Sequence, residues 1–257
     1  MSAARRARVL VTRPAAQAEA WVEQLRARGI DAEALPLIEI VAVDDRSALQ
    51  AAWETLAEHS LVFFVSANAV QHFFAARPEP GAWPEGVVAA APGPGTAAAL
   101  RAVGWPDAAI VSPATDAAQF DSEALWARLQ GRNWRGARVL VVRGDGGRDW
   151  LADRLTEAGA QVDALSAYRR VATSFAGAAR ERLEAAVAGD DVVWLFSSSE
   201  AIANLARAAG NTGWGRARAV ATHPRIAARA RGLGFGVVVE AGASLDAVVA
   251  CIQSIEP

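Results

Sequence analysis

RVLVTRPAAQAEAWVEQLRARG (8–29) is the stretch of sequence that decides the fold, because RVLVVRGDGGRDWLADRLTEAG (138–159) repeats its pattern. Each stretch begins with a short apolar, β-branched run and continues into a helical pattern that ends at a glycine. An arginine stands at the same place in both, as Arg13 and Arg143. A strand followed by a helix is therefore expected twice, in two related parts of the chain.

The repetition extends over most of the chain. FVSANAV (64–70) resembles FSSSEAI (196–202), and APGPGTAAALRAVG (91–104) resembles ATHPRIAARARGLG (221–234). A repeat of this length is too long for a solenoid, so it indicates duplication of a domain-sized unit.

Strand-like and helical stretches alternate along each repeat, and this alternation predicts the fold class. We expect an α/β fold of two similar lobes, each a parallel sheet flanked by helices. LPLIEIVAV (35–43) and LSAYRRVA (165–172) are strand-like and sit where a domain boundary is expected, so a two-stranded linker should join the lobes. Asp121 and Ser244 are predicted helix N-caps.

The composition limits the classes of protein. A hydrophobic fraction of 53% over 257 residues indicates a folded chain with a sizeable core. Its apolar runs are shorter than the ~18 residues of a membrane span, and its N-terminus lacks a secretory pattern, so a cytoplasmic protein is expected. The net charge of −2 gives no general attraction to nucleic acid. The single cysteine, Cys251, excludes a cysteine-rich zinc site and is expected in the core.

All 26 basic residues are arginines, whose planar fork can bind both oxygens of a carboxylate. Ligands of open α/β sheets bind beyond the carboxyl ends of the strands. Residues that directly follow predicted strands are therefore expected to line one cleft between the lobes. These residues are Thr12, Arg13, Ser66, Gly93, Pro94, Gly95, Thr96, Arg143, Ser198, Thr222, His223 and Pro224.

GPGTAA (93–98) follows a predicted strand and matches the dinucleotide-binding fingerprint. It does not lie at the first strand of its lobe, however, and its repeat mate HPRIAA (223–228) contains no glycine. An anion-binding turn of backbone N–H groups at a helix start is the other interpretation.

The serines also have two interpretations. Ser198 and His223 could form a hydrolase pair, although the chain has no G-x-S-x-G motif. Alternatively, Ser66 and Ser198 cap the helices that follow them. The other histidines, His59 and His72, are expected on helical surfaces.

Tyr168, in DALSAYRRV (163–171), is the only tyrosine of the chain. It is either an amphipathic residue on a linker strand or a phenol that meets a ligand.

In their order and spacing, the motifs of this chain resemble the uroporphyrinogen-III synthase family. The resemblance covers about Val9 to Cys251. The motifs that carry it are VLVTRP, LPLIEI, FVSANAV, GPGTAAAL, DSEAL, VLVVRGDGGRDWL, SAYRRV and DVVWLFSSSEAI.

The resemblance implies a discontinuous α/β domain of residues 1–37 and 170–257, an inserted α/β domain of residues 41–166, and linker strands at 37–41 and 166–170. It also implies an enzyme, a monomer without metal or cofactor. The substrate would be hydroxymethylbilane, a linear tetrapyrrole with eight carboxylates. Its closure to uroporphyrinogen III removes water and inverts ring D.

The resemblance further implies the roles of individual residues. Tyr168 would point into the cleft and assist departure of the substrate hydroxyl, because a phenol stays protonated at neutral pH and can donate a hydrogen bond. The residues expected to hold the substrate are Arg13, Ser66, Gly95, Thr96, Arg143 and Ser198. The chain departs from the family pattern at Ile226, where a threonine often stands opposite Thr96. His223, Arg225 or backbone N–H groups are the expected replacements.

A non-enzymatic, two-lobed module that binds a small molecule is the rival interpretation. It would share the duplicated lobes and the cleft. Turnover of hydroxymethylbilane separates the enzyme from the binding module.

Overall fold

The computed structural model describes residues 7–78, 83–114, 121–146, 150–242 and 244–255. Contacts within the chain group it into two compact units. Unit 1 combines Met1–Glu39 with Val171–Pro257, and unit 2 is Ile40–Arg170.

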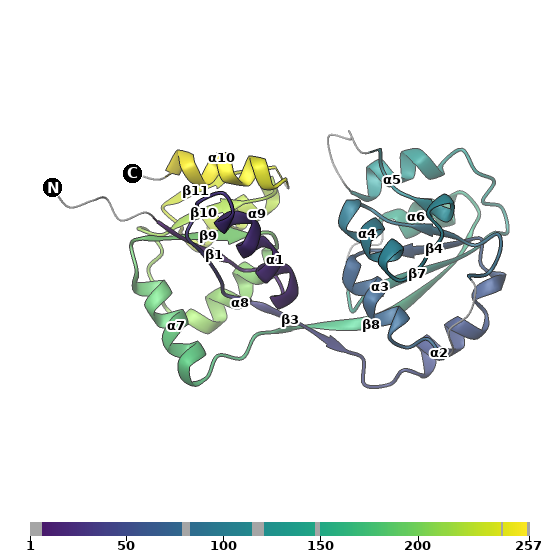
Figure 1. Ribbon diagram of the computed structural model, residues 1–257, viewed down its shortest axis with the longest axis horizontal. Coiled ribbons are helices and arrows are strands. Elements are labelled where there is room, and N and C mark those ends of the chain that lie inside the picture. Colours follow the sequence, from purple (N-terminus) through teal and green to yellow (C-terminus); the bar gives the residue numbers. More distant parts are fainter. Residues whose placement is uncertain (1–6, 79–82, 115–120, 147–149, 243, 256–257) are drawn as a thin grey trace. The chain divides into compact units, whose positions relative to one another are not determined.

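Unit 1 is built on a five-stranded sheet (Figure 1). Its strands are β1 (Arg8–Val11), β2 (Ala32–Ala34), β9 (Val192–Phe196), β10 (Arg218–Ala221) and β11 (Val237–Glu240). They lie in the order β11-β10-β9-β1-β2, and every neighbouring pair is parallel. The helices are α1 (Ala15–Arg26), α7 (Gly177–Ala188), α8 (Ser199–Ala209), α9 (Pro224–Leu233) and α10 (Leu245–Ile255).

Successive side chains of β1 and β9 point to opposite faces of the sheet in unit 1. Because nearly all of these successive side chains are apolar, both faces of the sheet are apolar. Val9 and Val11 pack with Leu25 of α1 and Ile252 of α10 in one buried cluster. Cys251 lies in α10 and packs against this cluster, as expected from the sequence.

Unit 2 is built on a six-stranded sheet. Its strands are β3 (Ile38–Ala42), β4 (Leu61–Phe64), β5 (Val88–Ala90), β6 (Ile110–Val111), β7 (Arg138–Gly144) and β8 (Gln161–Ala172). The order is β3-β8-β7-β4-β5-β6, and the pairs from β8 to β6 are parallel. The helices are α2 (Ser47–Glu54), α3 (Ala67–Phe74), α4 (Pro94–Ala102), α5 (Ser122–Leu129) and α6 (Trp150–Glu157), with 3-10 turns at Leu56–Glu58 and Asp107–Ala109.

Helices cover both faces of the sheet in unit 2. On one face, Phe64 of β4 packs in a buried cluster that includes residues of α2, α3 and α4. On the other face, Phe63 packs with Leu125 of α5 and Leu151 of α6. Consecutive residues of β4 thus supply opposite layers of the core, as expected for a strand that is buried on both faces.

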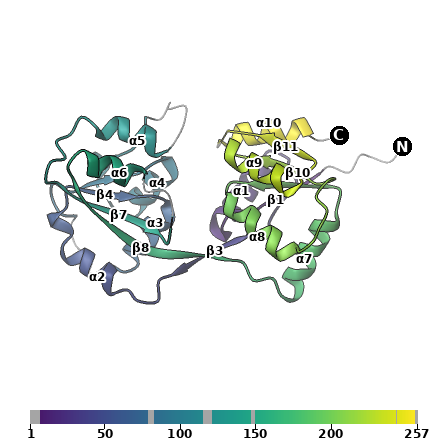
Figure 2. The same cartoon turned by 180° about the vertical axis from the view of Figure 1, so that it is seen from behind.

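The predicted α/β class with two parallel sheets is confirmed. The strand expected at 165–172 begins earlier, at Gln161, because β8 pairs with β7 from that residue on. The chain passes between the units within β3 and β8, which are neighbouring strands (Figure 2). Strand β10 was expected only from the placing of Thr222 just after a strand, because in RARAVA (216–221) arginines interrupt the apolar pattern.

The local signals at helix ends are confirmed. Asp121 accepts a hydrogen bond from the Ala124 N–H at 2.9 Å, and Ser244 accepts one from Ala247 at 3.3 Å. Gly234 ends α9 with φ of 102°, a backbone conformation that residues with a Cβ rarely adopt.

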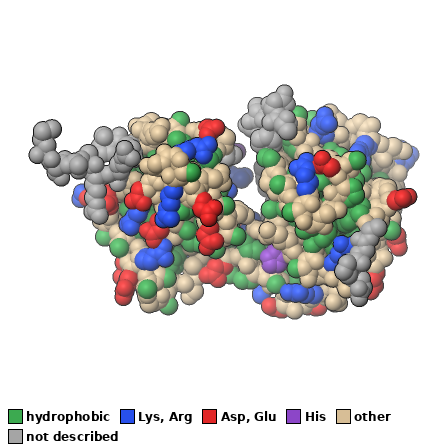
Figure 3. All heavy atoms as spheres, viewed as in Figure 1, with side chains coloured by type: hydrophobic (Ala, Val, Ile, Leu, Met, Phe, Trp, Pro, Cys, Tyr) green, Lys and Arg blue, Asp and Glu red, His purple; other side chains and the backbone are tan. Residues whose placement is uncertain are grey.

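Among the described residues, no helix is both long enough and apolar enough to cross a lipid bilayer. Acidic and basic side chains are intermingled on the face of the molecule shown in Figure 3.

Candidate functional site

In unit 2, two helices begin side by side at the carboxyl edge of the sheet. Ser66 follows β4 and caps α3, where its Oγ accepts a hydrogen bond from the Ala69 N–H at 3.2 Å. Helix α4 follows the neighbouring strand β5, and its first helical bond runs from the Ala97 N–H to the Gly93 carbonyl. The N–H groups of Gly95 and Thr96 precede this bond and are left outside the helical ladder. Two sets of such donors therefore lie at one edge of the sheet.

Gly95 is exposed, and neither the backbone conformation nor the packing at this position requires a glycine. Its φ lies outside the left-handed region, and a Cβ built there would meet no atom within 4 Å. A side chain at this position would therefore fit the fold, while it would lie beside the N–H groups at the start of α4.

Tyr168 lies on β8, and its side chain is buried in the core of unit 2 with 4% exposure. Its hydroxyl lies 3.1 Å from Ser66 Oγ. The phenol therefore reaches the carboxyl edge from within the core, where it contacts the serine that caps α3. The ring of Tyr168 thus packs in the core and its hydroxyl contacts Ser66, while a contact of the phenol with a ligand stays a prediction.

His72 was expected on a helical surface, but it is half-buried on α3, with its ring centroid 5.6 Å from that of Tyr168. Burial, with a smaller contribution from the charge of Arg46, lowers the pKa of His72 below its usual 6.5. This shift favours the uncharged form of the ring beside the phenol.

The expectation for His59 was wrong. This residue is 4% exposed, and its Nδ1 lies 3.1 Å from the Thr55 carbonyl, because the 3-10 turn before β4 folds back onto the core.

Arg143 was expected just after a strand, and this expectation was wrong. Strand β7 continues to Gly144, because β8 is long enough to pair with it at Arg143 opposite Ser166. Arg143 is therefore a half-buried residue within the sheet, near the end of β7.

In unit 1, Arg13 follows β1 at the carboxyl edge. Its guanidinium lies over the ring of Trp21, with Cζ 4.5 Å from the centroid. Within the described residues it has no carboxylate within ion-pair distance, and its Nε is buried without a hydrogen-bond partner. Burial lowers the pKa of Arg13 to about 10, so the side chain keeps its charge at pH 7.

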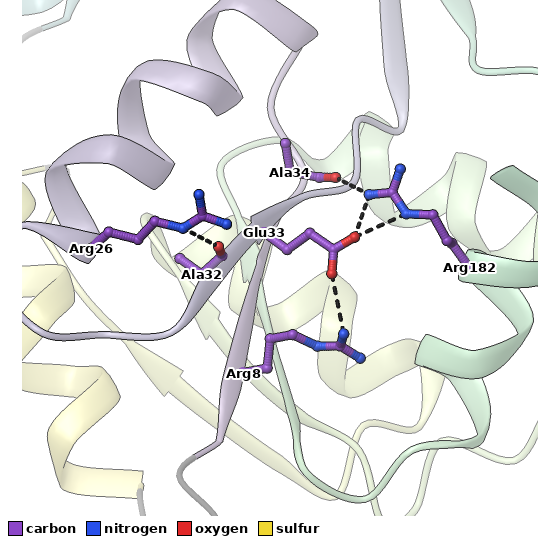
Figure 4. A network of polar contacts seen from close by, with 6 residues as sticks. All are labelled: Arg8, Arg26, Ala32, Glu33, Ala34 and Arg182. Carbon is purple, nitrogen blue, oxygen red and sulfur yellow. Dashed lines mark hydrogen bonds and ion pairs between the residues drawn. The ribbon is translucent and has the colours of Figure 1, made fainter. Parts of the chain in front are cut away.

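Two other arginines of unit 1, Arg8 and Arg182, share a carboxylate partner. Glu33 on β2 binds both Arg8 of β1 and Arg182 of α7, and Figure 4 shows this carboxylate between the two guanidinium groups. Arg182 also donates to the Ala34 carbonyl at 3.0 Å. These contacts tie α7 to the edge of the sheet. Arg13 differs from these residues in having no carboxylate within the described chain.

Two further helices begin side by side in unit 1, in the same way as in unit 2. Ser198 caps α8 by accepting from the Glu200 N–H at 3.1 Å, and His223 caps α9 by accepting from the Arg225 N–H at 3.1 Å. A pocket of about 580 Å³ lies between these starts. Its lining residues are Ser197, Ser198, Ser199, Glu200, Arg225, Ile226, Ala228 and Arg229.

The hydrogen bonds of this pocket argue against a hydrolase pair. Ser198 and His223 each accept from the backbone of their own helix, and no hydrogen bond joins them within the described residues. Capping therefore accounts for the positions of both serines, Ser66 and Ser198, while it leaves backbone N–H groups of the same helix starts available to a ligand.

Comparison with known proteins identifies the family. Residues 19–250 match the family model described as "Uroporphyrinogen-III synthase HemD". The chain is 39% identical over 171 residues to the uroporphyrinogen-III synthase of Salmonella typhimurium LT2, and 33% identical over 171 residues to that of Escherichia coli K12. Each match covers 66% of this chain and 68% of the relative. This chain belongs to the uroporphyrinogen-III synthase family.

Solved structures of uroporphyrinogen-III synthases have the same fold. A mutant enzyme from the extreme thermophile Thermus thermophilus gives a TM-score of 0.59 at 18% identity, with 96% of this chain and 98% of that chain covered. The enzyme from Helicobacter pylori 26695 gives 0.61 at 16% identity, with 98% and 100% covered. The family model and the curated relatives confirm the resemblance stated from the sequence motifs, and with it the activity of the family, a hydro-lyase of tetrapyrrole biosynthesis.

Two residues near the expected site, His72 and Arg229, were missed from the sequence. His72 lies beside Tyr168, and Arg229 lines the pocket of unit 1. Arg229 could have been found from its spacing of one helical turn after Arg225, which places both on one face of a helix. No comparable signal marked His72, because its proximity to Tyr168 depends on the packing of α3 against β8.

Proposed function

We propose that this chain closes hydroxymethylbilane to uroporphyrinogen III and that the hydroxyl of Tyr168 assists the departure of the substrate hydroxyl. The observation that supports this role is a chain of polar groups that runs from the Ala69 N–H through Ser66 Oγ to the Tyr168 hydroxyl.

In this proposal Ser66 donates to the Tyr168 oxygen while it accepts from Ala69. The phenol proton is then left for the substrate. Hydrogen bonds in series polarise one another, and the start of α3 adds the positive end of the helix dipole. The phenol thereby becomes a better donor without carrying a charge.

The chemistry needs such a donor. The C–O bond of the hydroxymethyl group breaks with help from the pyrrole nitrogen, and the oxygen leaves as water after it gains a proton. A hydrogen bond to this oxygen strengthens as negative charge develops on it, so it lowers the barrier more than it stabilises the bound substrate.

The remaining residues hold substrate carboxylates in this proposal. Backbone N–H groups at the starts of α3 and α4 bind carboxylates beside Ser66, Gly95 and Thr96, and Ser198 does the same at α8. Arg13 and Arg143 supply the positive charge. Holding a flexible chain in one reactive geometry is an orientation effect, and it favours the closure that inverts ring D.

Arg225 takes the place of the family threonine at Ile226 in this proposal. Ile226 is buried with 6% exposure, so its side chain is directed into the core. Arg225 and Arg229 line the pocket of unit 1 together with Ile226, and they bring the guanidinium groups that Ile226 lacks. A guanidinium beside a helix start binds a carboxylate more strongly than a hydroxyl does.

The proposal also assigns the two compact units to the two domains of the family and treats the chain as a cytoplasmic monomer. Sedimentation equilibrium at several protein concentrations tests the monomer.

Replacing Gly95 by Ala tests the carboxylate cradle. The added methyl group meets no protein atom, and alanine favours a helix, so the free energy of unfolding should stay the same or rise. The methyl group stands at the approach to the N–H groups, so the affinity for uroporphyrinogen III should fall by about tenfold. An anaerobic binding titration measures this change.

The matched control is Gly131→Ala, which adds a methyl group in equally open space just after the end of α5. It should leave product affinity unchanged. Equal affinities for wild type and Gly95→Ala would remove Gly95 from the site.

The activity itself is tested with hydroxymethylbilane made in situ by its synthase, followed by oxidation and separation of the uroporphyrin isomers. We expect mostly isomer III. Isomer I at the level formed without enzyme would mean that the chain keeps the fold without the chemistry, and the small-molecule binding module would then be the better interpretation.

A further inference from the structure

Strand β8 contains a bulge immediately before Tyr168. Arg143 pairs with Ser166, but the next residue of β7, Gly144, pairs with Tyr168, so Ala167 is the extra residue. Burial follows the same irregularity. Leu165 is buried, Ser166 is exposed, and then Ala167 and Tyr168 are buried in succession. A bulge of this kind changes the direction of the side chain that follows it.

Gly144 provides the space that the ring of Tyr168 occupies. A Cβ built on Gly144 would lie 2.7 Å from Tyr168 Cε2 and 2.8 Å from Cζ, which is closer than real Cβ atoms come to other heavy atoms. The φ of Gly144 is not left-handed, so the backbone itself does not require glycine. The absence of a side chain at Gly144 therefore serves the ring of Tyr168.

The bulge is held by the residue that follows Gly144. The Asp145 N–H donates to the Tyr168 carbonyl at 3.0 Å, and Asp145 Oδ1 accepts from the Arg170 N–H at 3.0 Å. These two bonds fix the backbone on both sides of Arg169. The position of the phenol ring is thus determined by the backbone of β7, and its hydroxyl contacts Ser66.

We propose that Gly144, the bulge at Ala167 and the Asp145 bonds form a positioning device that directs the hydroxyl of Tyr168 toward Ser66. Gly144 and Asp145 are positioning residues, because they act on the reaction through Tyr168. This proposal rests on the function proposed above for the phenol. Its tests therefore include one measurement that does not depend on turnover.

The first test uses the sole tyrosine as a reporter. Protein labelled with [ζ-¹³C]tyrosine has one such resonance, which belongs to Tyr168. Ser66→Ala removes the contact of the hydroxyl and should shift this resonance, which calibrates the measurement. Gly144→Ala should also shift it, and Gly131→Ala should not. An unshifted resonance in folded Gly144→Ala overturns the proposal, whatever the turnover.

The second test compares turnover in two backgrounds. Gly144→Ala should lower kcat by roughly 10- to 100-fold with little change in KM, because a displacement of about 1 Å is enough to disturb a catalytic group. In the Tyr168→Phe background, the same substitution should lower kcat no further. The same fold loss in both backgrounds would mean that Gly144 serves only the fold, and this result overturns the proposal.

If Gly144→Ala does not fold, Asp145→Asn takes its place in both tests. This substitution keeps the shape of an exposed side chain and weakens the hydrogen bond that it accepts from the Arg170 N–H. We expect a smaller shift of the same resonance and a smaller loss of kcat, again only when Tyr168 is present. A shifted resonance together with unchanged turnover in Tyr168→Phe would support the positioning device and reject the function proposed for the phenol.

Discussion

Replacing Tyr168 by Phe should lower kcat by about 100-fold, while the affinity for uroporphyrinogen III changes little. The ring remains in the core, and only the hydroxyl that contacts Ser66 is lost. Because the lost hydrogen bond acts mainly in the transition state, kcat should fall much more than product affinity. Single-turnover kinetics with hydroxymethylbilane, with the isomers separated, measures both the rate and the product.

The isomer ratio provides an internal check. Hydroxymethylbilane closes without an enzyme to the isomer in which ring D is not inverted, so slower catalysis leaves more substrate to this route. The fraction of isomer I should therefore rise with Tyr168→Phe at limiting enzyme. The loss of one neutral hydrogen bond should cost about 1 kcal/mol of unfolding free energy. If kcat were unchanged while the free energy of unfolding fell by this small amount, Tyr168 would be a structural residue of the core and not a catalytic one.

The fold was predictable to the extent that apolar patterns recur in the sequence. The runs that became β1, β4, β7 and β9 are apolar on both faces, because helices cover both faces of each sheet, and such runs are visible in the sequence. Strand β10 has no clear apolar run of its own, because arginines interrupt it, so the sequence indicated it only through the placing of Thr222 after a strand, although both of its neighbours pair with it. Its pairing depends on the position of β9, which local periodicity does not contain.

The candidate site was predictable where a residue's role follows from its place after a strand. Ser66 and Ser198 cap helices, which was one of the two interpretations of the sequence. Capping depends only on neighbouring residues, because a serine between a strand and a helix can bind the first N–H groups of that helix. The contact of Ser66 with Tyr168 joins residues that are far apart in the sequence, and it depends on the order β8-β7-β4 and on a bulge. The family resemblance suggested Tyr168, but only the structure shows the bulge that directs its side chain.

Arg13→Met should weaken the binding of uroporphyrinogen III by roughly 10- to 100-fold without lowering the free energy of unfolding. A half-buried guanidinium whose Nε lacks a hydrogen-bond partner, and which has no carboxylate partner among the described residues, is costly to the folded state, and burial lowers its pKa to about 10 for the same reason. Methionine fills a similar space without the charge. Removal of this charge should therefore favour folding, and the lost contact with the Trp21 ring should offset part of the gain.

The opposite directions of the two effects make this prediction discriminating. If Arg13 only supported the fold, its replacement would lower the free energy of unfolding. If Arg13 binds an anion, its replacement lowers the affinity for product and leaves the stability unchanged. Arg28→Met is the matched control, because it removes the same charge from the same unit, where Arg28 pairs with exposed Asp246. It should leave product affinity unchanged, while Arg13→Lys should restore part of the affinity that Arg13→Met loses, since lysine keeps the charge without the planar fork. Product affinity and urea unfolding of the three variants measure these effects. If Arg13→Met lost stability without losing affinity, Arg13 would belong to the core of unit 1 and not to the binding site.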